Sequence, residues 1–356
     1  MLNQLLVNLA FISNKPTGIT TYANNLIPHL QKLQPTLLSA KQIDDRTCYP
    51  VAPNLTPDEG SKGHLRRLRW TQFQLPQIYK QLRSHLLFSP LPEAPLFTNC
   101  RYIVTVHDLI PLRFARRSPL TYYSRYYIPQ VLAQAQHIIC NSTATAVDIT
   151  RFYGIAESKI TPILLAHDAH NFRWLNLPKS NYFLYIGRQD PYKNLQRTIA
   201  AFAAMPNNRD YQLWLAGSPD DRYTSTLKAL IDNLGITEQV KFLDYVPYNQ
   251  LPIIINSAIA LIFPSLWEGF GFPVLEAMAC GTPVITSNIS SMPEVAQNAA
   301  LLVDPYNTSE ISAAMQEIAN SEQMRSHLRE LGLNRASQFS WEKTGLATVE
   351  ALSRFL

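Results

Sequence analysis

The sequence contains little glycine and little charge. Only 12 of its 356 residues are Gly, against roughly 7% in average usage, and 16% are charged, against roughly 25%. Each glycine is therefore informative about the loop that contains it. Because 46% of the residues are hydrophobic and no segment has a biased composition, the sequence excludes the disordered and fibrous classes of protein.

Long apolar runs and a secretory leader are also missing. No apolar stretch approaches the roughly 18 to 20 residues that are needed to cross a bilayer. Residues 1–12 lack a basic beginning and a small-residue cleavage site, so we expect a first strand there and not a signal peptide. These features predict an intracellular protein.

Motifs for metals, disulfides and common nucleotide cofactors are absent. The four cysteines are widely separated and form neither a CxxC pair nor a Cys/His ligand spacing, which indicates neither a zinc site nor a disulfide framework. Neither GxGxxG nor GxxxxGK[ST] follows a predicted strand. A nicotinamide dehydrogenase and a P-loop NTPase are therefore disfavoured.

Positive charge is concentrated in the first half of the chain. Residues 1–170 contain 17 Lys and Arg against 9 Asp and Glu, a net charge of +8, whereas residues 171–356 contain 14 against 17, a net charge of −3. The densest basic segments, 62–70 and 113–127, also contain Trp and Tyr. Such a face suits an anionic membrane, a phosphorylated acceptor or nucleic acid. A solvated surface whose aromatic side chains point into the core fits the same pattern.

Short apolar runs alternate with longer amphipathic stretches. The expected strands are 5–12, 86–88, 102–106, 137–140, 182–186, 212–216, 240–242, 258–263, 283–287 and 300–303. The expected helices are 20–33, 65–82, 122–135, 144–152, 195–204, 223–234, 251–256, 273–279, 292–296 and 309–319. This alternation favours an α/β fold with two doubly wound, mostly parallel sheets, which bind ligands outside the carboxyl ends of their strands.

The polar segment 167–179 interrupts this alternation. We therefore expect one domain at residues 1–168 and a second at 169–340. A C-terminal helix at 341–356 is expected to pack back on the first domain. A two-domain protein of this kind is expected to bind its ligand in the cleft.

The segment that follows the strand at 258–263 has the strongest signal for a binding site. Gly269 and Gly271 leave the loop without side chains, and a short helix should follow with its free amides aimed at a ligand. Glu268 and Glu276 bracket this loop and suit sugar hydroxyls as hydrogen-bond acceptors. The alternatives are that Glu268 is an exposed loop acid and that Glu276 simply complements the helix dipole.

Two other strand-to-helix loops are candidates for phosphate binding. Arg188 and Lys193 follow the strand at 182–186, where two cations suit a diphosphate; a solvated basic loop is the alternative. Gly18 stands in the first such loop of the chain, where bare backbone suits a phosphate, although a turn glycine fits equally well. His107 and Asp108 follow the strand at 102–106, where a histidine oriented by Asp108 suits a substrate hydroxyl or proton transfer; a structural histidine is the alternative.

The segments around these residues resemble the retaining nucleotide-sugar glycosyltransferases of family 4. The match is densest over residues 182–305 and centres on an E-x7-E motif, Glu268-GFGFPVL-Glu276. GRQDPYKNL at 187–195, PEVAQNAALLVDP at 293–305 and VHDLIPLRF at 106–114 support it. The resemblance implies the GT-B fold, in which two Rossmann-like domains face each other across a cleft.

The resemblance also implies roles for single residues. Glu268 and the amides of Gly269, Phe270, Gly271 and Phe272 would hold the donor hexose, and Glu276 would hold the ribose. Arg188 and Lys193, in the loop that opens with Gly187, would clamp the diphosphate, with Gly18 as a phosphate contact from the first domain. His107 would lie beside the reacting sugar, and the base would lie near Tyr245 and Val246.

By the same resemblance we expect transfer of a hexose, with mannose or rhamnose favoured, from a nucleoside-diphosphate sugar to a hydroxyl acceptor, with retention and without a metal or other cofactor. The expected acceptor is a glycan or a lipid-linked saccharide of surface polysaccharide synthesis. The expected location is cytoplasmic, with peripheral contact to an anionic membrane at its inner face, and no nucleic-acid partner. A non-catalytic nucleotide-sugar or glycan-binding protein and a sugar-nucleotide epimerase are the alternative functions.

Overall fold

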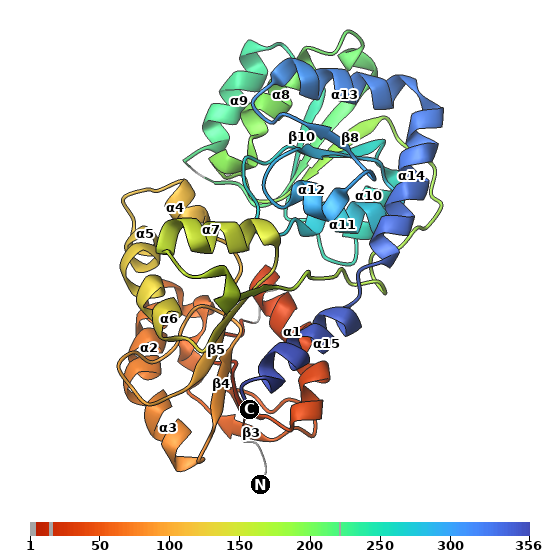
Figure 1. Ribbon diagram of the computed structural model, residues 1–356. Coiled ribbons are helices and arrows are strands. Elements are labelled where there is room, and N and C mark those ends of the chain that lie inside the picture. Colours follow the sequence, from red (N-terminus) through yellow and green to blue (C-terminus); the bar gives the residue numbers. More distant parts are fainter. Residues whose placement is uncertain (1–4, 14–16, 221) are drawn as a thin grey trace. The chain divides into compact units, whose positions relative to one another are not determined.

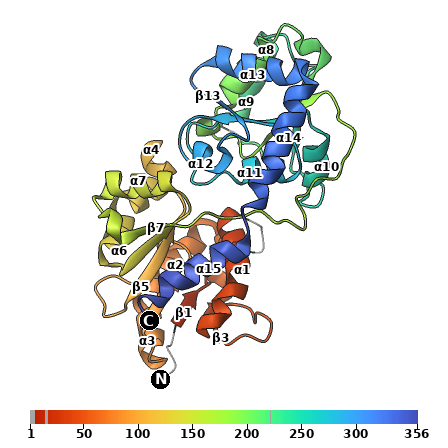
Figure 2. The ribbon, with the colours of Figure 1, turned by 45° about the vertical axis from the view of Figure 1, so that its right-hand side comes forward.

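The computed structural model describes residues 5–13, 17–220 and 222–356. The chain divides into two compact units (Figures 1 and 2). Unit 1 comprises Met1–Leu165 together with Trp341–Leu356, and unit 2 comprises Ala166–Ser340. The change from unit 1 to unit 2 lies just before the polar segment 167–179.

Unit 1 contains a parallel sheet of seven strands within the described residues, in the order β3-β2-β1-β4-β5-β6-β7. Its strands are β1 (Leu5–Asn8), β2 (Thr36–Ser39), β3 (Cys48–Pro50), β4 (Leu86–Ser89), β5 (Tyr102–Val106), β6 (His137–Cys140) and β7 (Ile160–Pro162). Its α-helices are α1 (Gly18–Leu30), α2 (Gly60–Phe73), α3 (Leu75–Gln81), α4 (Ile110–Arg113), α5 (Pro119–Tyr122), α6 (Ile128–Gln134), α7 (Thr143–Tyr153) and α15 (Trp341–Ser353). Short 3-10 turns are η1 (Gln31–Leu33), η2 (Pro53–Leu55), η3 (Pro57–Glu59) and η5 (Glu157–Lys159), and η4 (Tyr123–Tyr127) is a π-helical turn.

Unit 2 contains a parallel sheet of six strands within the described residues, in the order β10-β9-β8-β11-β12-β13. Its strands are β8 (Tyr182–Ile186), β9 (Gln212–Ala216), β10 (Val240–Asp244), β11 (Ala260–Phe263), β12 (Val284–Ser287) and β13 (Leu301–Val303). Its helices are α8 (Leu195–Ala203), α9 (Thr224–Asn233), α10 (Leu251–Ser257), α11 (Phe272–Ala279), α12 (Met292–Ala296), α13 (Thr308–Asn320) and α14 (Glu322–Ser337), with 3-10 turns η6 (Pro191–Lys193) and η7 (Asn208–Asp210). Figure 1 shows α8, α9 and α13 on one face of the sheet and α10, α11 and α12 on the other.

Both sheets reverse their strand order at one point. In unit 1 the chain starts at β1, proceeds outward to β3 and returns to β4 on the other side of β1. In unit 2 the same reversal occurs between β8 and β11. The central strands are buried on both faces, as expected of continuous apolar runs in parallel sheets. The prediction of two doubly wound parallel sheets is confirmed, and the reversal points are where such sheets bind ligands.

Several elements differ from the sequence prediction. The strands β2, β3 and β7 were not predicted, because three or four residues give too little apolar pattern to distinguish a strand from a loop. The single helix expected at 65–82 is two helices, since Pro76 opens α3 without a backbone N–H. The helix expected at 122–135 consists of α5, the π-helical turn and α6, with Pro129 at the start of α6. The first strand ends at Asn8, four residues before its predicted end.

Helix α15 belongs to unit 1, although the chain passes through the whole of unit 2 before reaching it. It packs on α1, where Gly345 lies so close to His29 that a Cβ would overlap the histidine side chain. The Thr344 hydroxyl donates a hydrogen bond to the carbonyl of Leu164 at 2.7 Å. In the described part of the chain, no helix has both the length and the apolar character to span a membrane.

Candidate functional site

The candidate site residues of unit 2 lie at one edge of its sheet. Because all strands of this sheet are parallel, their carboxyl ends meet at the same edge. The loop after β8 carries Arg188 and Lys193, and the loop after β11 carries Glu268 and leads into α11 with Glu276. Since β8 and β11 are the neighbours at which the strand order reverses, these two loops flank the position where an α/β sheet of this type binds its ligand.

The loops after β8 and β11 are held together by a backbone hydrogen bond and by the side chain of Asn194. The amide of Leu266 donates to the carbonyl of Tyr192 at 2.8 Å. The buried Asn194 amide group donates to the carbonyls of Pro264 at 3.0 Å and Pro305 at 2.6 Å. These bonds hold the functional side chains of the two loops at a fixed separation.

A side-chain ion pair also joins the two loops. The Lys193 ammonium lies 2.6 Å from Glu268 Oε1, and the two side chains are only 13% and 9% exposed. The ammonium also lies 5.1 Å from the centre of the Phe263 ring and 5.3 Å from that of Tyr192, within cation–π range. Lysine has three N–H donors, so Lys193 retains capacity for a further acceptor beside Glu268.

Arg188 occupies a different environment from Lys193. Its side chain is 75% exposed and lies 3.3 Å from the buried carboxylate of Asp190. The carbonyl of Arg188 accepts a hydrogen bond from the buried Tyr185 hydroxyl at 2.8 Å, which fixes the backbone at the start of the loop. Gly187 has φ +149°, and a Cβ there would lie 2.9 Å from the Tyr185 hydroxyl oxygen. A side chain at position 187 would therefore disturb this anchor.

Two serines after β12 shape the loop around Glu268. The amide of Glu268 donates to Ser290 Oγ at 2.8 Å, and the Ser290 hydroxyl donates back to the Glu268 carbonyl at 2.7 Å. The Ser291 hydroxyl lies within hydrogen-bond distance of the carbonyls of Glu268 and Phe270, at 3.1 and 3.0 Å. The carbonyls of this turn are thereby occupied, which favours a loop that presents its amides to a ligand.

Gly271 is the N-cap of α11 and has φ +103°, a conformation that residues with a side chain rarely adopt. A Cβ at this position would also overlap the side chain of Met292. The helix has no side-chain cap, and its first-turn amides, including that of Phe272, have no intrahelical acceptor. Phe270 packs edge-on against Phe272 at 5.4 Å. The arrangement suits an acceptor or a partial negative charge at the helix start.

Glu276 is a half-buried residue of α11 whose surroundings alter its ionisation. Burial, with an additional contribution from the nearby charge of Asp168, raises the pKa of Glu276 to about 8. Asp168 accepts hydrogen bonds from the amides of His170 and Asn171 and from the Tyr248 hydroxyl at 3.1 Å. A buried carboxyl group with a raised pKa is typical of a ligand-binding position.

The remaining predicted residues are placed as follows. Val246 is half-buried in the loop after β10, at the same sheet edge as the other loops of unit 2. In unit 1, Gly18 is the exposed first residue of α1, after Thr17 as N-cap. Residues 14–16 of that loop lie outside the described residues. Within the described chain, no group of three or more His, Cys, Asp and Glu side chains could hold a metal ion.

His107 follows β5 in unit 1. Its Nε2 lies 2.8 Å from the carbonyl of Pro90, and because a carbonyl can only accept, Nε2 carries the proton. Burial lowers the pKa of His107 to about 4, so the imidazole is neutral near pH 7 and its Nδ1 is an acceptor. The Asp108 carboxylate accepts from the amide of Ile110 at 3.0 Å, while the His107 ring packs edge-on against Tyr22.

The sequence reasoning missed several residues that shape these loops: Asp168, Asn194, Ser290 and Ser291. A signal existed for Asn194, because an Asn before an amphipathic helix is suited to the left-handed backbone that it adopts here, with φ +65°. Asp168 lies in the polar segment taken only as a domain boundary. Its proximity to Glu276, 108 positions later, depends on the tertiary fold.

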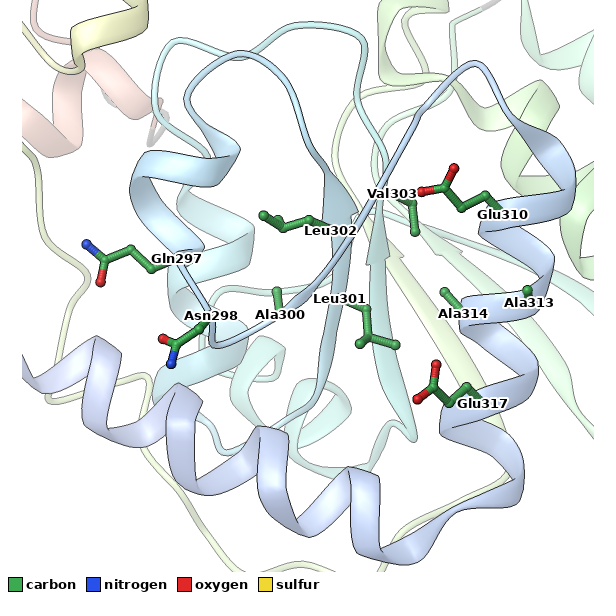
Figure 3. Close-up of a pocket in the computed structure, with 10 residues that line it drawn as sticks. All are labelled: Gln297, Asn298, Ala300, Leu301, Leu302, Val303, Glu310, Ala313, Ala314 and Glu317. Atoms are coloured by element: carbon green, nitrogen blue, oxygen red, sulfur yellow. The ribbon is translucent and has the colours of Figure 1, made fainter.

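A separate hollow of about 460 Å³ lies between β13 and α13. Figure 3 shows Leu301 and Ala314 on facing elements, with Glu310 and Glu317 on α13. The hollow is lined by none of the predicted site residues. It therefore contributes nothing to the candidate site at the carboxyl edge of the sheet.

Two family models match consecutive parts of the chain. Residues 168–335 match the model for glycosyl transferases group 1, and residues 16–169 match that for glycosyltransferase family 4. The O-antigen chain mannosyltransferase B of Escherichia coli is 30% identical over 269 residues, which is 70% of this chain and 70% of that protein. The chain belongs to glycosyltransferase family 4.

Other similarities agree with this membership. The O-antigen chain mannosyltransferase RfbU of Salmonella typhimurium is 28% identical over 325 residues, 88% of this chain and 90% of that protein. Among solved structures, Anabaena Alr3699/HepE in complex with UDP-glucose superposes with a TM-score of 0.77 at 17% identity, over 99% of both chains. Sucrose-phosphate synthase from Thermosynechococcus elongatus has a TM-score of 0.76 at 18% identity, over 99% of this chain and 98% of that one. The predicted fold class, GT-B, and the predicted enzyme class, a retaining glycosyltransferase of family 4, are confirmed.

Proposed function

We propose that this glycosyltransferase transfers mannose from a nucleoside-diphosphate sugar to a hydroxyl group of a glycan or lipid-linked saccharide in the synthesis of a surface polysaccharide. Two relatives that cover most of the chain are named as O-antigen chain mannosyltransferases. The observation that carries the proposal is the Lys193–Glu268 pair at the strand reversal of unit 2, beside the uncapped start of α11. A sugar diphosphate needs a cation, a hydrogen-bond acceptor and the amides of a helix start at one place.

We assign unit 2 to the donor and unit 1 to the acceptor. Glu268 and the amides of Gly269 to Phe272 bind the hexose, and Glu276 accepts from the ribose hydroxyls. Lys193 and Arg188 bind the diphosphate: Lys193 as a fixed, buried cation, and Arg188 as an exposed side chain that is free to reach a ligand. Gly187 and Val246 line the ends of this subsite.

In the reaction, the leaving diphosphate gains negative charge as the glycosidic bond breaks. The ammonium of Lys193 stabilises that charge, since it has three N–H donors and a phosphate oxygen can accept one of those that Glu268 does not use. Lys193 and Arg188 together take the place of a metal ion. We favour same-face departure and attack as the origin of retention, with a covalent glycosyl-enzyme as the alternative, because none of the proposed site residues is placed as an obvious nucleophile.

Unit 1 contributes Gly18 and His107 to this scheme. The first-turn amides of α1, beginning at Gly18, suit a phosphate oxygen. His107, with a neutral ring, accepts a hydrogen bond from a sugar hydroxyl through Nδ1. The proposed location is the cytoplasmic side of the cell membrane, where a lipid-linked acceptor is reached by peripheral contact with anionic lipid.

A panel of GDP, UDP, ADP and dTDP sugars tests the donor by thermal shift. A ligand at 100 times its dissociation constant adds about 2.7 kcal/mol to the free energy of unfolding, so the correct donor should give a distinct shift. Release of nucleoside diphosphate that requires a glycan acceptor supports transfer. Donor binding without any turnover would instead support a non-catalytic binding protein, and a changed sugar nucleotide without acceptor would support an epimerase.

A further inference from the structure

We infer that unit 1 binds an anionic lipid bilayer through the outer surface of α2 together with the outer surface of α5 and the π-helical turn η4. We call this surface the α2–η4 face. It is defined by two rows of exposed residues, Lys62, Leu65, Arg69 and Phe73 on α2 and Leu120, Tyr122, Arg125 and Tyr126 on α5 and η4. The inference deepens the proposed contact with a membrane, but vesicle binding can be measured whatever reaction the enzyme catalyses.

Helix α2 exposes apolar and basic side chains in one row. Leu65 is 61% exposed and Phe73 is 69% exposed, and Lys62 and Arg69 are exposed between and beside them. The spacing of three to four residues places all four on one side of the helix. The opposite side carries Trp70, which is buried in the core of unit 1. A helix that already buries one face has no folding reason to expose Leu and Phe on the other.

The turn η4 exposes a second row. Tyr122 and Tyr126 are both exposed and stack on each other, with ring centres 6.3 Å apart and planes inclined by 11°. Arg125 is exposed between them in the sequence. A π-helical turn is rare and occurs most often at functional sites. Tyrosines of this kind, with an apolar ring and a polar hydroxyl, are enriched where protein meets the surface of a bilayer.

The two rows belong to one continuous surface, because α2 and η4 pack directly against each other. The His64 ring of α2 lies 5.1 Å from the Tyr123 ring, edge to face. The Gln72 side chain of α2 donates to the Tyr127 hydroxyl at 2.9 Å. Tyr123 and Tyr127 are stacked on the inner side of η4, so Tyr122 and Tyr126 are left on the outer side. Figure 1 shows α2, α5 and α6 next to one another on the same side of unit 1.

The charge around the α2–η4 face is predominantly positive. Residues 58–135 contain 11 Lys and Arg against four acids, Asp58, Glu59, Glu93 and Asp108, and Glu59 pairs with Arg66 at 3.2 Å. Glu93 is buried, and its two carboxylate oxygens accept hydrogen bonds from Arg67 Nε and Nη2, at 2.7 and 2.8 Å. Asp108 accepts from the start of α4. Glu93 and Asp108 are thus engaged within unit 1, and the outward field of this region is mainly that of its cations.

Five of the exposed cations lie on α2, in η4 or directly before α5: Lys62, Arg69, Arg116, Arg117 and Arg125. In the described residues, none of the five takes part in an ion pair. Apolar side chains set among unpaired cations fit a bilayer of anionic lipids, which offers an acyl region and negative headgroups together. Nucleic acid would engage the cations, but it offers no apolar phase for Leu65, Phe73 and Leu120.

Co-sedimentation of the full chain with vesicles tests the inference. We expect binding to phosphatidylcholine vesicles that contain about 30% phosphatidylglycerol, little binding to phosphatidylcholine alone, and release in about 0.5 M NaCl. The triple variant Arg69→Gln, Arg117→Gln, Arg125→Gln should lower the partition coefficient by roughly 100-fold. The double variant Leu65→Ser, Phe73→Ser should lower it by roughly 10-fold or more at constant charge.

Matched variants in unit 2 supply the control. The triple variant Arg209→Gln, Lys228→Gln, Lys241→Gln removes the same amount of charge. The double variant Ile253→Ser, Tyr306→Ser removes exposed apolar side chains. The inference would be overturned by equally strong binding to neutral vesicles or by no binding to anionic vesicles. It would also be overturned if the unit 2 variants lost as much binding as the unit 1 variants. A short DNA duplex that displaces the vesicles, and whose own binding the unit 1 variants weaken equally, would also overturn it. Lys193→Ala should retain vesicle binding, which separates this inference from the proposed reaction.

Discussion

The ammonium of Lys193 donates a hydrogen bond to Glu268 across 2.6 Å, although the two residues are 75 positions apart in the sequence. Each comes from a different strand-to-helix loop, and both side chains are largely buried. Loss of one partner leaves the other as an unpaired buried charge. The same pair therefore supports both the stability of unit 2 and the electrostatics of the proposed donor site.

Substitution of Lys193 should affect catalysis and stability together. Lys193→Ala should lower turnover by about 10² to 10³-fold, because a fixed cation beside the leaving diphosphate is lost. It should also lower the free energy of unfolding by about 3 kcal/mol, because Glu268 keeps its buried charge. Steady-state kinetics and denaturant unfolding measure the two effects.

The double variant Lys193→Met, Glu268→Gln separates these effects. Since neither position then carries a charge, most of the lost stability should return while turnover stays low. Arg188→Gln, at an exposed side chain, should leave unfolding almost unchanged. Near-normal turnover in Lys193→Ala would refute the catalytic role of the lysine.

Glu276 should make donor binding depend on pH. Its pKa is raised to about 8, first by burial and then by Asp168, and ribose hydroxyls bind best to the ionised carboxylate. Below pH 8, binding should therefore release a proton, and affinity for nucleoside diphosphate should increase as the pH approaches 8. Calorimetry in buffers of different ionisation enthalpy measures the proton release. An affinity that is unchanged in Glu276→Gln would remove the ribose assignment.

The same carboxyl group should shape the pH dependence of stability. Its pKa is about 8 in the folded protein against 4.5 for an ordinary glutamate side chain, so between these values the folded state binds more protons than the unfolded state. Stability should fall as the pH rises through this window. Glu276→Gln, which stays neutral, should reduce that fall. A denaturant series at several pH values that shows equal slopes for both proteins would contradict the prediction.

Gly271→Ala should weaken both unit 2 and donor binding. The backbone has φ +103°, and the new methyl group would overlap Met292, so we expect a loss of about 2 to 4 kcal/mol in unfolding free energy. Gly154→Ala is the matched control, because its φ is +67° and no atom lies within 4 Å of the added Cβ; it should cost only about 1 kcal/mol. Adding Met292→Ala to Gly271→Ala should restore the part of the unfolding free energy that is lost to the overlap with Met292. Thermal unfolding of the wild type and the three variants separates the cost of the backbone conformation from the cost of the overlap.

His107 should act without changing its charge. Because burial lowers its pKa to about 4, the ring is neutral through the physiological range, and Pro90 fixes the proton on Nε2. His107→Ala should lower turnover through loss of an acceptor for a sugar hydroxyl. The pH–rate profiles of the wild type and of His107→Gln should therefore have the same shape near pH 6.5. An inflection there in the wild type that is absent from the variant is not expected. Such an inflection would show that the histidine titrates during turnover.

The alternation of strands and helices could be predicted because the central strands are continuous apolar runs, such as Tyr102–Val106 and Tyr182–Ile186. Their order in the sheet follows from the connections between parallel strands. Short edge strands such as Cys48–Pro50 have no such pattern. The break at Leu75–Gln81 was missed because the amphipathic pattern continues across it, although Pro76 was a usable signal.

At the candidate site, the loops could be predicted but their internal contacts could not. Strand ends and scarce glycines located Lys193 and Glu268, yet no local pattern indicates that the two side chains pair. The environment of Glu276 depends on Asp168, and the loop around Glu268 depends on Ser290. Such contacts arise from packing between elements distant in sequence, which a local pattern does not encode.

Helix α15 closes against α1 only after the whole of unit 2 has been made. During translation, the surface of α1 that α15 covers stays open while residues 166–340 are synthesised. Unit 1 therefore completes its packing only after residues 341–356 have left the ribosome. Although its synthesis begins first, unit 1 is the unit whose maturation ends last, and chaperones that bind apolar helix faces would meet it during that interval.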